Sequence, residues 1–329
     1  MRNRIMILLI LSIFTLTIFS SICFADPIRF SISANCTPEH PFSRSMKWVE
    51  RTLERRTNGE IDVEYYFLGQ LGSAKEQMEL LMSGDLDYVM LGPREVGRYI
   101  PEVGILNGPY IFRDFDHAFK VMESSIGKEL NEKCIDQLGI RIIVGVYEFG
   151  VRHLTTSKKI IKSPEDLHGE KMRVMDEPVS IAVMRAMGAK AVPIAFGELY
   201  LALKQGIADG QENPISNIIA CKFQEVQKYL MLTGHVWNIG CGFINEAKYQ
   251  SLTPENREIV VNTLQEGSAI SDFLTEQAEI EGFKIWEEAG NEIIKVDVEA
   301  FKKPVVESIY YDLKKDEWKD LFEEIQAIE

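Results

Sequence analysis

The sequence lacks both an excess of positive charge and the motifs of the common enzyme classes. Its 329 residues include 36 Lys and Arg but 50 Asp and Glu, so that the formal net charge is −14. Sequence-independent binding of nucleic acid needs a basic face that displaces counterions, and we therefore expect no nucleic-acid partner. No G-x-S-x-G, H-E-x-x-H, Walker or dinucleotide-binding motif occurs in the chain. These absences exclude the enzyme classes that depend on those motifs.

Residues that hold metals are also scarce. The five His are scattered, and no pair of them has the spacing of metal ligands. None of the five Cys forms a C-x-x-C motif, which argues against zinc and thioredoxin chemistry. We expect no metal and no cofactor. Four Cys beyond the N-terminal segment allow three disulfide pairings, but small core residues are the simpler interpretation; they are Cys36, Cys134, Cys221 and Cys241.

Long apolar runs are absent except at the N-terminus. Two Arg precede an uncharged apolar stretch over residues 5–19, and a small residue ends the segment at position 25. This layout predicts a signal peptide over 1–25 and export to the periplasm; an uncleaved anchor and a lipidated Cys23 are the alternatives. Cleavage would remove two Arg and no acidic residue, which leaves 34 basic and 50 acidic residues and a net charge of −16.

A rhythm of alternating strands and helices follows. Residues 28–33 and 61–67 have strand patterns, and an amphipathic helix over 42–56 separates them. Ser73 begins a capping box at the start of the next helix, and a strand over 140–146 ends this first round. A second round of the same kind comes after it. The rhythm predicts an α/β fold with parallel strands and helices on both faces, in two related lobes.

The C-terminal region departs from this rhythm. Pro254 begins a helical pattern that continues to residue 288, which is 35 residues or about 52 Å at 1.5 Å per residue. A helix of that length exceeds one small lobe, and we interpret it as a spine across both lobes. Two helices broken near Gly267 are the alternative. A last amphipathic helix is predicted over 316–328.

Polar residues gather where strands are predicted to end. Asn213 lies in the polar stretch 209–214, between a strand and a helix, and it fits either the N-cap of that helix or a ligand contact. Arg152 follows one predicted strand and Arg173 lies within another. A guanidinium in such a place needs a partner, because an unpaired buried charge is strongly disfavoured. A carboxylate suits it best, whether from a ligand or from an acidic residue of the chain.

These residues lie in segments with a family resemblance. Residues 152–174, 188–214 and 222–230 resemble the substrate-binding subunit of TRAP (tripartite ATP-independent periplasmic) transporters, the DctP-like family, and residues 69–87 resemble it more loosely. The resemblance implies a two-lobed periplasmic-binding-protein fold, type II-like, with a long helix spanning both lobes and a ligand cleft between them. The predicted lobes comprise 26–149 plus about 239–278 (lobe I) and 150–238 plus about 279–329 (lobe II).

The resemblance also implies roles for residues of the second lobe. Arg173 is similar to the family's carboxylate clamp, and Asn213 to the amide that bonds the same carboxylate. Arg152 is similar to a second contact to the carboxylate or to water. Phe196 resembles an apolar wall of the ligand site, and Glu198 a structural partner near the hinge.

The first lobe departs from the family's sialic-acid binders. Those resemble each other in an Asn after the first strand and in carboxylates in two later loops, where this chain has Ser33, Ser73 and Gly92. The departure weakens a sialic-acid assignment, and the pattern fits a sugar acid, such as a uronate or an aldonate, or another hydroxy-acid better than a C4-dicarboxylate. Binding of a C4-dicarboxylate, sialic acid or another organic acid by the same fold is the alternative. Further candidate ligand contacts are Glu39, His40, Phe42, Ser73, Trp237 and Asn238. Trp237 fits either a ring stacked on a sugar or a side chain of the core.

The resemblance thus implies a receptor and not an enzyme. We expect a monomeric extracytoplasmic protein that captures a small anionic solute and passes it to the small and large integral membrane subunits of a TRAP transporter. An exported enzyme acting on sugar acids, and a sensor component that presents its ligand to a receptor, are the alternatives from other classes. No catalytic residue is expected.

Overall fold

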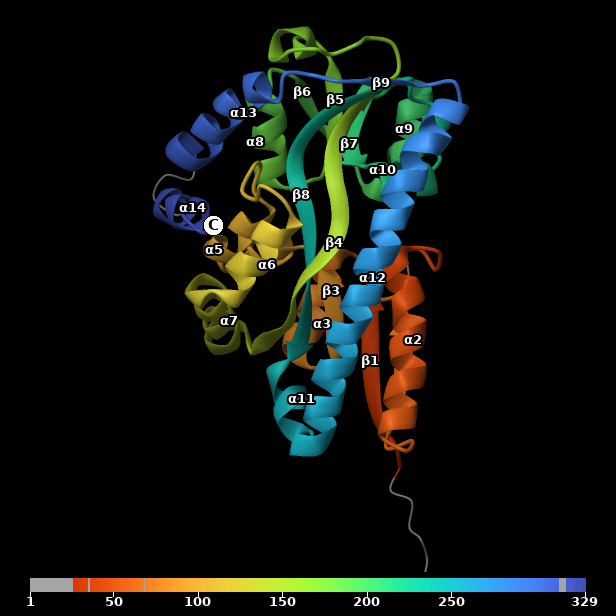
Figure 1. The fold of residues 1–329 in the computed structure, drawn as a ribbon, viewed down its shortest axis with the longest axis vertical. Coiled ribbons are helices and arrows are strands. Elements are labelled where there is room, and N and C mark those ends of the chain that lie inside the picture. The colour runs from red at the N-terminus through yellow and green to blue at the C-terminus, as the bar shows by residue number, and fades with distance from the viewer. Residues whose placement is uncertain (1–25, 35, 68, 314–317) are drawn as a thin grey trace, which may run out of the picture.

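The computed structural model describes residues 26–34, 36–67, 69–313 and 318–329 (Figure 1). The predicted signal peptide and the first residues of the predicted last helix lie outside these ranges. Within them, no helix combines the length and the apolar character that crossing a membrane requires.

One mixed sheet runs through the whole molecule. Its strand order is β2-β1-β3-β8-β4-β7-β5-β6, with β9 added to β8. β1 pairs in parallel with β2 and β3, and β5 pairs in parallel with β6 and β7. The predicted α/β class is therefore confirmed, but the prediction of parallel strands holds only within these two sets, because β3–β8, β4–β7 and β4–β8 pair in antiparallel orientation. The strands are β1 Ile28–Ala34, β2 Ile61–Tyr66, β3 Tyr88–Leu91, β4 Ile140–Thr156, β5 Lys171–Val174, β6 Lys190–Pro193, β7 Gly210–Pro214, β8 Tyr229–Asn245 and β9 Glu292–Ile294.

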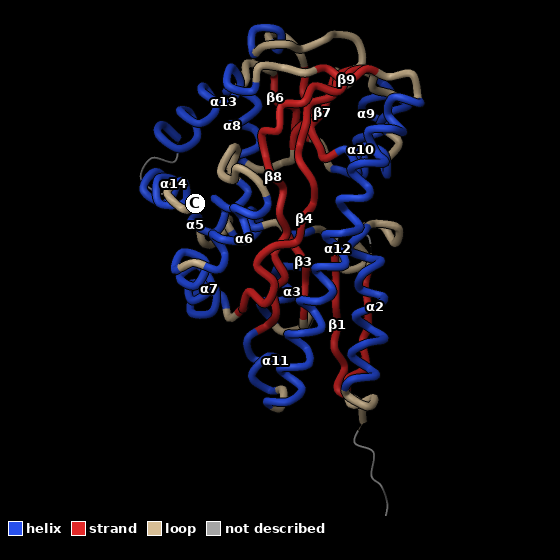
Figure 2. Tube along the Cα trace, viewed as in Figure 1, coloured by secondary structure: helices blue, strands red, loops and turns tan. Residues whose placement is uncertain are grey.

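A long antiparallel pair joins the two parallel sets, as Figure 2 shows. β4 and β8 have 17 residues each; β8 pairs with β3 at one end, and β4 pairs with β7 at the other. We call the half built on β1–β3 lobe I and the half built on β5–β7 lobe II. The strand predicted over 140–146 thus continues to Thr156. Register shifts between β4 and β8 disturb the alternation of buried and exposed residues, so the sequence pattern does not show the continuation.

Helices flank the sheet in both lobes. Those of lobe I are α2 Pro41–Arg56, α3 Ala74–Ser83, α4 Pro93–Val96, α5 Pro101–Gly104, η1 Ile105–Asn107, α6 Phe115–Glu123 and α7 Ser125–Leu138. Those of lobe II are η2 Pro164–Leu167, α8 Pro178–Ala186, η3 Phe196–Glu198, α9 Leu199–Gln205, α10 Ile215–Ala220 and η4 Phe223–Glu225. After β8 come α11 Glu246–Ser251, α12 Pro254–Glu288, α13 Val298–Val306, η5 Glu307–Leu313 and α14 Lys319–Gln326.

The predicted capping box is present at the start of α3. The Ser73 hydroxyl accepts a hydrogen bond from the backbone N–H of Glu76 at 3.3 Å, and the Glu76 carboxylate accepts one from the N–H of Ser73 at 2.6 Å. Two of the amides that a helix start leaves without partners are thereby bonded. The cap fixes the point at which the chain turns from β2 into α3.

α12 is the predicted spine, and it is unbroken over 35 residues. Gly267 does not interrupt it. A Cβ at that position would lie 2.4 Å from Cγ2 of Val49, so the missing side chain lets α2 pack closely against α12. In lobe II the corresponding close approach is at Gly282, which faces Ile215 of α10. The prediction of one continuous helix is confirmed, and the alternative of two helices is wrong.

The crossing of β4 between the lobes is held by side chains of α12. The register of β4 against β8 shifts between Glu148 and Val151, and Gly150 has a φ of +88°. The shift frees backbone amides: the N–H of Glu148 donates to Asp272 Oδ1 at 2.8 Å, and that of Val151 donates to Glu279 Oε2 at 3.3 Å. Carboxylates of the spine therefore stabilise an irregular strand that would otherwise leave polar groups without partners.

The C-terminal segment returns to the edge of lobe I. Tyr310 donates its hydroxyl proton to the carbonyl of Pro109 at 2.8 Å, and His117 Nε2 lies 3.0 Å from the carbonyl oxygen of Ile325. α13 contacts β8 and, together with η5, contacts α8 of lobe II. The sequence places residues 279–329 with lobe II, and the division of the chain into lobes stays a prediction. The structure shows that this segment lies against both lobes.

Candidate functional site

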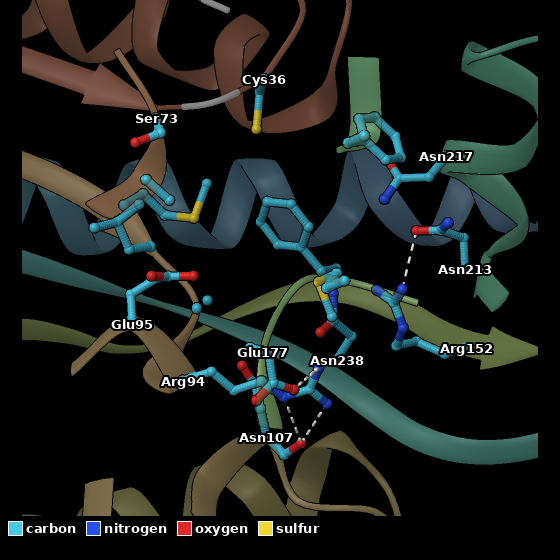
Figure 3. Close-up of a pocket in the computed structure, with 18 of the residues that line it drawn as sticks. Cys36, Ser73, Arg94, Glu95, Asn107, Arg152, Glu177, Asn213, Asn217 and Asn238 are labelled. Atoms are coloured by element: carbon cyan, nitrogen blue, oxygen red, sulfur yellow. Dashed lines mark hydrogen bonds and ion pairs between the residues drawn. The ribbon is translucent and has the colours of Figure 1, made fainter. Parts of the chain in front are cut away.

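A cavity of about 440 Å³ lies between the lobes, beyond the carboxyl ends of β3, β5 and β7. Residues of both lobes and of the crossing strands line it. Ligands of open α/β sheets bind at this edge, because loops of variable sequence meet there on a rigid scaffold. Figure 3 shows the polar side chains that face this space.

Arg173, in β5, is the guanidinium of the lining for which the described residues supply no carboxylate partner. Its side chain is 1% exposed, its Nε donates to the carbonyl of Ile194 at 2.9 Å, and its buried Nη1 has no hydrogen-bond partner in the described part of the chain. Burial lowers the pKa of Arg173 to about 10, against the opposing effect of Glu212, so the guanidinium stays charged at neutral pH. A buried cation with a free donor favours binding of an anion.

Arg152, in β4, lies in the lining and belongs to a buried polar network. Its Nε and Nη2 both donate to the carboxylate of Glu212, the Nη2 bond being 2.8 Å long. His235 Nε2 lies 3.1 Å from the same carboxylate. Burial alone would raise the pKa of Glu212, but the Arg152 charge and these hydrogen bonds hold it well below its usual range. An internal carboxylate thus neutralises Arg152, whereas no described carboxylate forms an ion pair with Arg173.

Asn213 lies within β7 and pairs with His153 of β4, so it is not a helix cap. The N-cap of α10 is Pro214, without a side-chain hydrogen bond, and the N-cap interpretation of Asn213 is wrong. β7 extends to Pro214 because β4 continues beside it, which the sequence pattern did not reveal. The Asn213 Oδ1 accepts from Arg152 Nη2 at 3.1 Å, and its Nδ2 donates to Gln211 at 2.5 Å. One amide proton remains for a ligand.

The remaining candidates divide between the lining and the surroundings of the cavity. Phe196, Ser73, His40 and Asn238 line it. The Phe196 ring centroid lies 5.8 Å from the Arg173 guanidinium carbon, in a position to cover a bound carboxylate. His40 is stacked on Phe149, and burial lowers its pKa to about 4, so it is neutral at pH 7.

Three candidates from the sequence are not in the lining. Glu39 is exposed to solvent beside His40. Trp237 packs edge-on against Phe115, with 5.0 Å between ring centroids, and Phe42 is buried against Tyr147. Both aromatic rings therefore have partners within lobe I and the crossing strands. The structure brings Arg152, Arg173, Phe196 and Asn213 together, as the resemblance implies for the second lobe.

Several polar residues of the lining were not found from the sequence. Arg94 donates through Nη2 to the carbonyl of Asn107 at 2.6 Å and through Nη1 to Ser180 of lobe II at 3.0 Å. Glu177, from lobe II, lies 3.6 Å from the same guanidinium. Arg94 comes three residues after the end of β3, and Glu177 comes three residues after the end of β5. Both carry the signal that residues 209–214 also carry in the sequence, a polar side chain just after a predicted strand.

The cysteines are free, as far as the described residues show. Cys134 and Cys241 are buried in the core, and Cys36 and Cys221 lie in the cavity lining from opposite lobes. Burial raises the pKa of the Cys36 thiol to about 12, so it is a neutral wall of the cavity. The interpretation of these residues as small packing groups agrees with their positions.

Two α/β lobes, crossing strands with a spine helix and a polar cavity between the lobes together define a solute-binding protein of the periplasmic type. The chain belongs to the bacterial extracellular solute-binding proteins of family 7, the DctP family, whose model matches residues 32–316. Members of this family are the solute receptors of TRAP transporters, and the prediction made from the sequence is confirmed.

Similar proteins of known structure carry sugar acids. A TRAP solute-binding protein from Ochrobacterium anthropi, with bound L-fuconate, is 33% identical with a TM-score of 0.83, over 92% of this chain and 99% of that one. A second, from Pseudomonas putida F1 with bound D-glucuronate, is 27% identical with a TM-score of 0.84, over 92% and 98%. The 2,3-diketo-L-gulonate-binding protein YiaO of Escherichia coli is 32% identical over 281 residues, 84% of each chain.

Proposed function

We propose that this protein captures a sugar acid, a uronate or an aldonate, and delivers it to the membrane subunits of a TRAP transporter. The observation that carries the proposal is the buried guanidinium of Arg173, whose Nη1 has no partner in the described chain. A carboxylate at that point would accept two charge-assisted hydrogen bonds and would also reach the amide of Asn213. The sugar acids bound to the similar structures support the choice of ligand class.

We infer that the protein is exported through the leader at 1–25 and is a monomer in the periplasm without a cofactor. Docking on the small and large membrane subunits is inferred from the role of the family. We expect capture to leave the ligand chemically unchanged, because the related proteins are solute receptors and the Arg152 guanidinium is already engaged by Glu212 and Asn213. Recovery of an altered sugar acid after incubation would instead favour the exported enzyme.

The first experiment is a thermal-shift screen of refolded, ligand-free mature protein. The panel holds uronates, aldonates, C4-dicarboxylates, sialic acid and keto acids. A ligand at about 100 times its Kd adds about 2.7 kcal/mol to the free energy of unfolding, which raises the Tm by several degrees in a chain of this size. A shift with sugar acids is expected. No shift with any acid would contradict the proposal.

The second experiment replaces Arg173 by Met, which keeps the aliphatic volume and removes the charge. Two charge-assisted hydrogen bonds, at about 1.5–3 kcal/mol each, are lost, so calorimetry should show binding at least 100-fold weaker. The ligand-free Tm should not fall, because the buried charge has no carboxylate partner to lose. Lys171→Met, on the same strand but outside the lining, is the control and should leave the Kd within about twofold.

A further inference from the structure

Four guanidinium groups line the cavity, and three of them already have a carboxylate partner. Arg94 lies 3.6 Å from Glu177, Arg98 lies 2.9 Å from Glu95, and Arg152 is bonded to Glu212. Each of these pairs is electrically neutral as a unit. Their donors position the walls of the cavity but present no uncompensated charge to a solute.

Arg173 is the fourth guanidinium, and no carboxylate of the described chain lies within ion-pair distance of it. Its side chain is almost completely buried, so solvent cannot screen the charge. The cavity therefore has a single uncompensated positive charge. One negative charge on the solute neutralises Arg173. For a second negative charge on the solute, the described lining residues offer no further unpaired cation.

Side chains that accept hydrogen bonds lie across the cavity from Arg152 and Asn213. Figure 3 shows Glu95 and Ser73 on one side and Arg152, Asn213 and Asn217 on the other. Glu95 follows β3 in the first turn of α4, its side chain is 21% exposed, and it belongs to the lining. A carboxylate there accepts hydrogen bonds from solute hydroxyl groups, and its ion pair with Arg98 withholds that guanidinium from a second carboxylate.

We infer that the cavity selects polyhydroxy acids with one carboxylate and rejects dicarboxylates, and that Glu95 is the specificity-determining residue. The inference rests on the proposed function, since it assumes that Arg173 holds the carboxylate of a sugar acid. Glu95 acts in two ways. It accepts hydroxyl protons on the side of the cavity across from Arg152 and Asn213, and it keeps Arg98 paired, so that Arg98 is not available to a second carboxylate.

The test compares acids that differ in the group at one end of the same carbon chain. D-Gluconate and D-glucuronate carry one carboxylate, and D-glucarate carries two; D-galactonate, D-galacturonate and galactarate form the second set. We expect calorimetry to show that, in any set that binds, the best monoacid binds at least 100-fold more tightly than the diacid. Equal or tighter binding of a diacid overturns the inference.

Glu95→Gln tests the residue itself. Gln has the same shape without the charge, so the monoacid should bind 3- to 10-fold more weakly. The diacid should bind more tightly, because Arg98 is released and can pair with its second carboxylate. The ratio of the two constants should narrow at least tenfold. Glu102→Gln is the matched control: Glu102 pairs with Lys133 on neighbouring helices outside the lining and should leave the ratio unchanged.

The outcomes separate the two proposals. An unchanged ratio in Glu95→Gln, with the ligand-free Tm showing a folded protein, contradicts the role of Glu95 and leaves the sugar-acid receptor intact. If none of the four monoacids binds the wild-type protein, the proposed function fails and the inference fails with it.

Discussion

At the scale of single residues, Arg152 and Arg173 show that the same side chain near the same cavity can be ion-paired within the protein or left for a ligand. Both sit in strands of lobe II near the cavity, and for both the sequence leaves an internal ion pair and a ligand contact open. The structure pairs Arg152 with Glu212, which is 60 positions away, and leaves Arg173 unpaired. The difference arises from which strands are neighbours in the sheet, β4 and β7 in the case of Arg152.

The buried pair makes a thermodynamic prediction. Glu212→Gln leaves the Arg152 charge buried without compensation, and breaking such a pair costs about 3–5 kcal/mol in free energy of unfolding. Urea denaturation of the ligand-free protein measures it. The control is Glu246→Gln: Glu246 accepts two hydrogen bonds from Arg141, as Glu212 does from Arg152, but in a partly exposed position, and should cost about 1 kcal/mol or less.

The comparison has a clear contrary outcome. If both variants lose the same free energy of unfolding, the buried position of the Arg152–Glu212 pair contributes no additional stability. The network around His235 then only satisfies buried polar groups.

At the scale of elements, the crossing of β4 depends on a glycine. Gly150 has a φ of +88°, and a Cβ there would lie 2.5 Å from Glu279 Oε1. That carboxylate accepts hydrogen bonds from the backbone amides of Val151 and Ser216, one in β4 and one in α10. Any side chain at position 150 therefore disturbs the contact by which the spine holds lobe II.

We expect Gly150→Ala to lower the free energy of unfolding by about 2–4 kcal/mol. Roughly 1 kcal/mol comes from the left-handed backbone and the rest from displacing Glu279 from its two amides. Gly169→Ala separates these causes, because Gly169 has a φ of +89° with nothing within 4 Å of its Cβ position. Gly169→Ala should lower the free energy of unfolding only by the contribution of the left-handed backbone, roughly 1 kcal/mol. If both variants lose the same free energy of unfolding in urea denaturation, Glu279 can move away from the new side chain without measurable cost.

At the scale of the whole molecule, charge opposes the approach of the ligand. The mature chain predicted from residue 26 carries −16, while the cavity lining, as far as it is described, has Arg173 as its one cation without a carboxylate partner. Long-range repulsion slows the encounter with an anion, and salt screens it: the Debye length falls from about 30 Å at 0.01 M to about 8 Å at 0.15 M. Affinity must therefore come from contacts made inside the cavity.

The association rate constant for a sugar acid should accordingly rise a few-fold between 0.01 M and 0.15 M NaCl. Stopped-flow tryptophan fluorescence measures it, and the dissociation rate constant, which reflects buried contacts, should change little. A rate that falls with salt would mean that Arg173 and its neighbours attract the ligand from a distance in spite of the net charge.

Much of the fold could be predicted from local pattern. Periodicity and capping residues predict α2, α3 and the spine α12. In α12, apolar residues recur at helical spacing, and Thr253 and Pro254 mark its start. Pattern failed where neighbours decide the structure. β4 continues past residue 146, and Asn213 lies in a strand, since backbone partners from β7 and β8 override the local signal.

The sequence by itself determined the class of this protein: its α/β rhythm, its spine and the second-lobe motifs sufficed to identify a TRAP solute receptor and to name Arg173, Asn213, Arg152 and Phe196. Only the tertiary structure decided which charges neutralise each other and which one is left for a ligand. The physical reason is that Coulomb interactions and hydrogen bonds depend on distances of a few ångströms. Arg94 and Glu177, or Arg152 and Glu212, reach such distances only when separate strands and both lobes meet around one cavity.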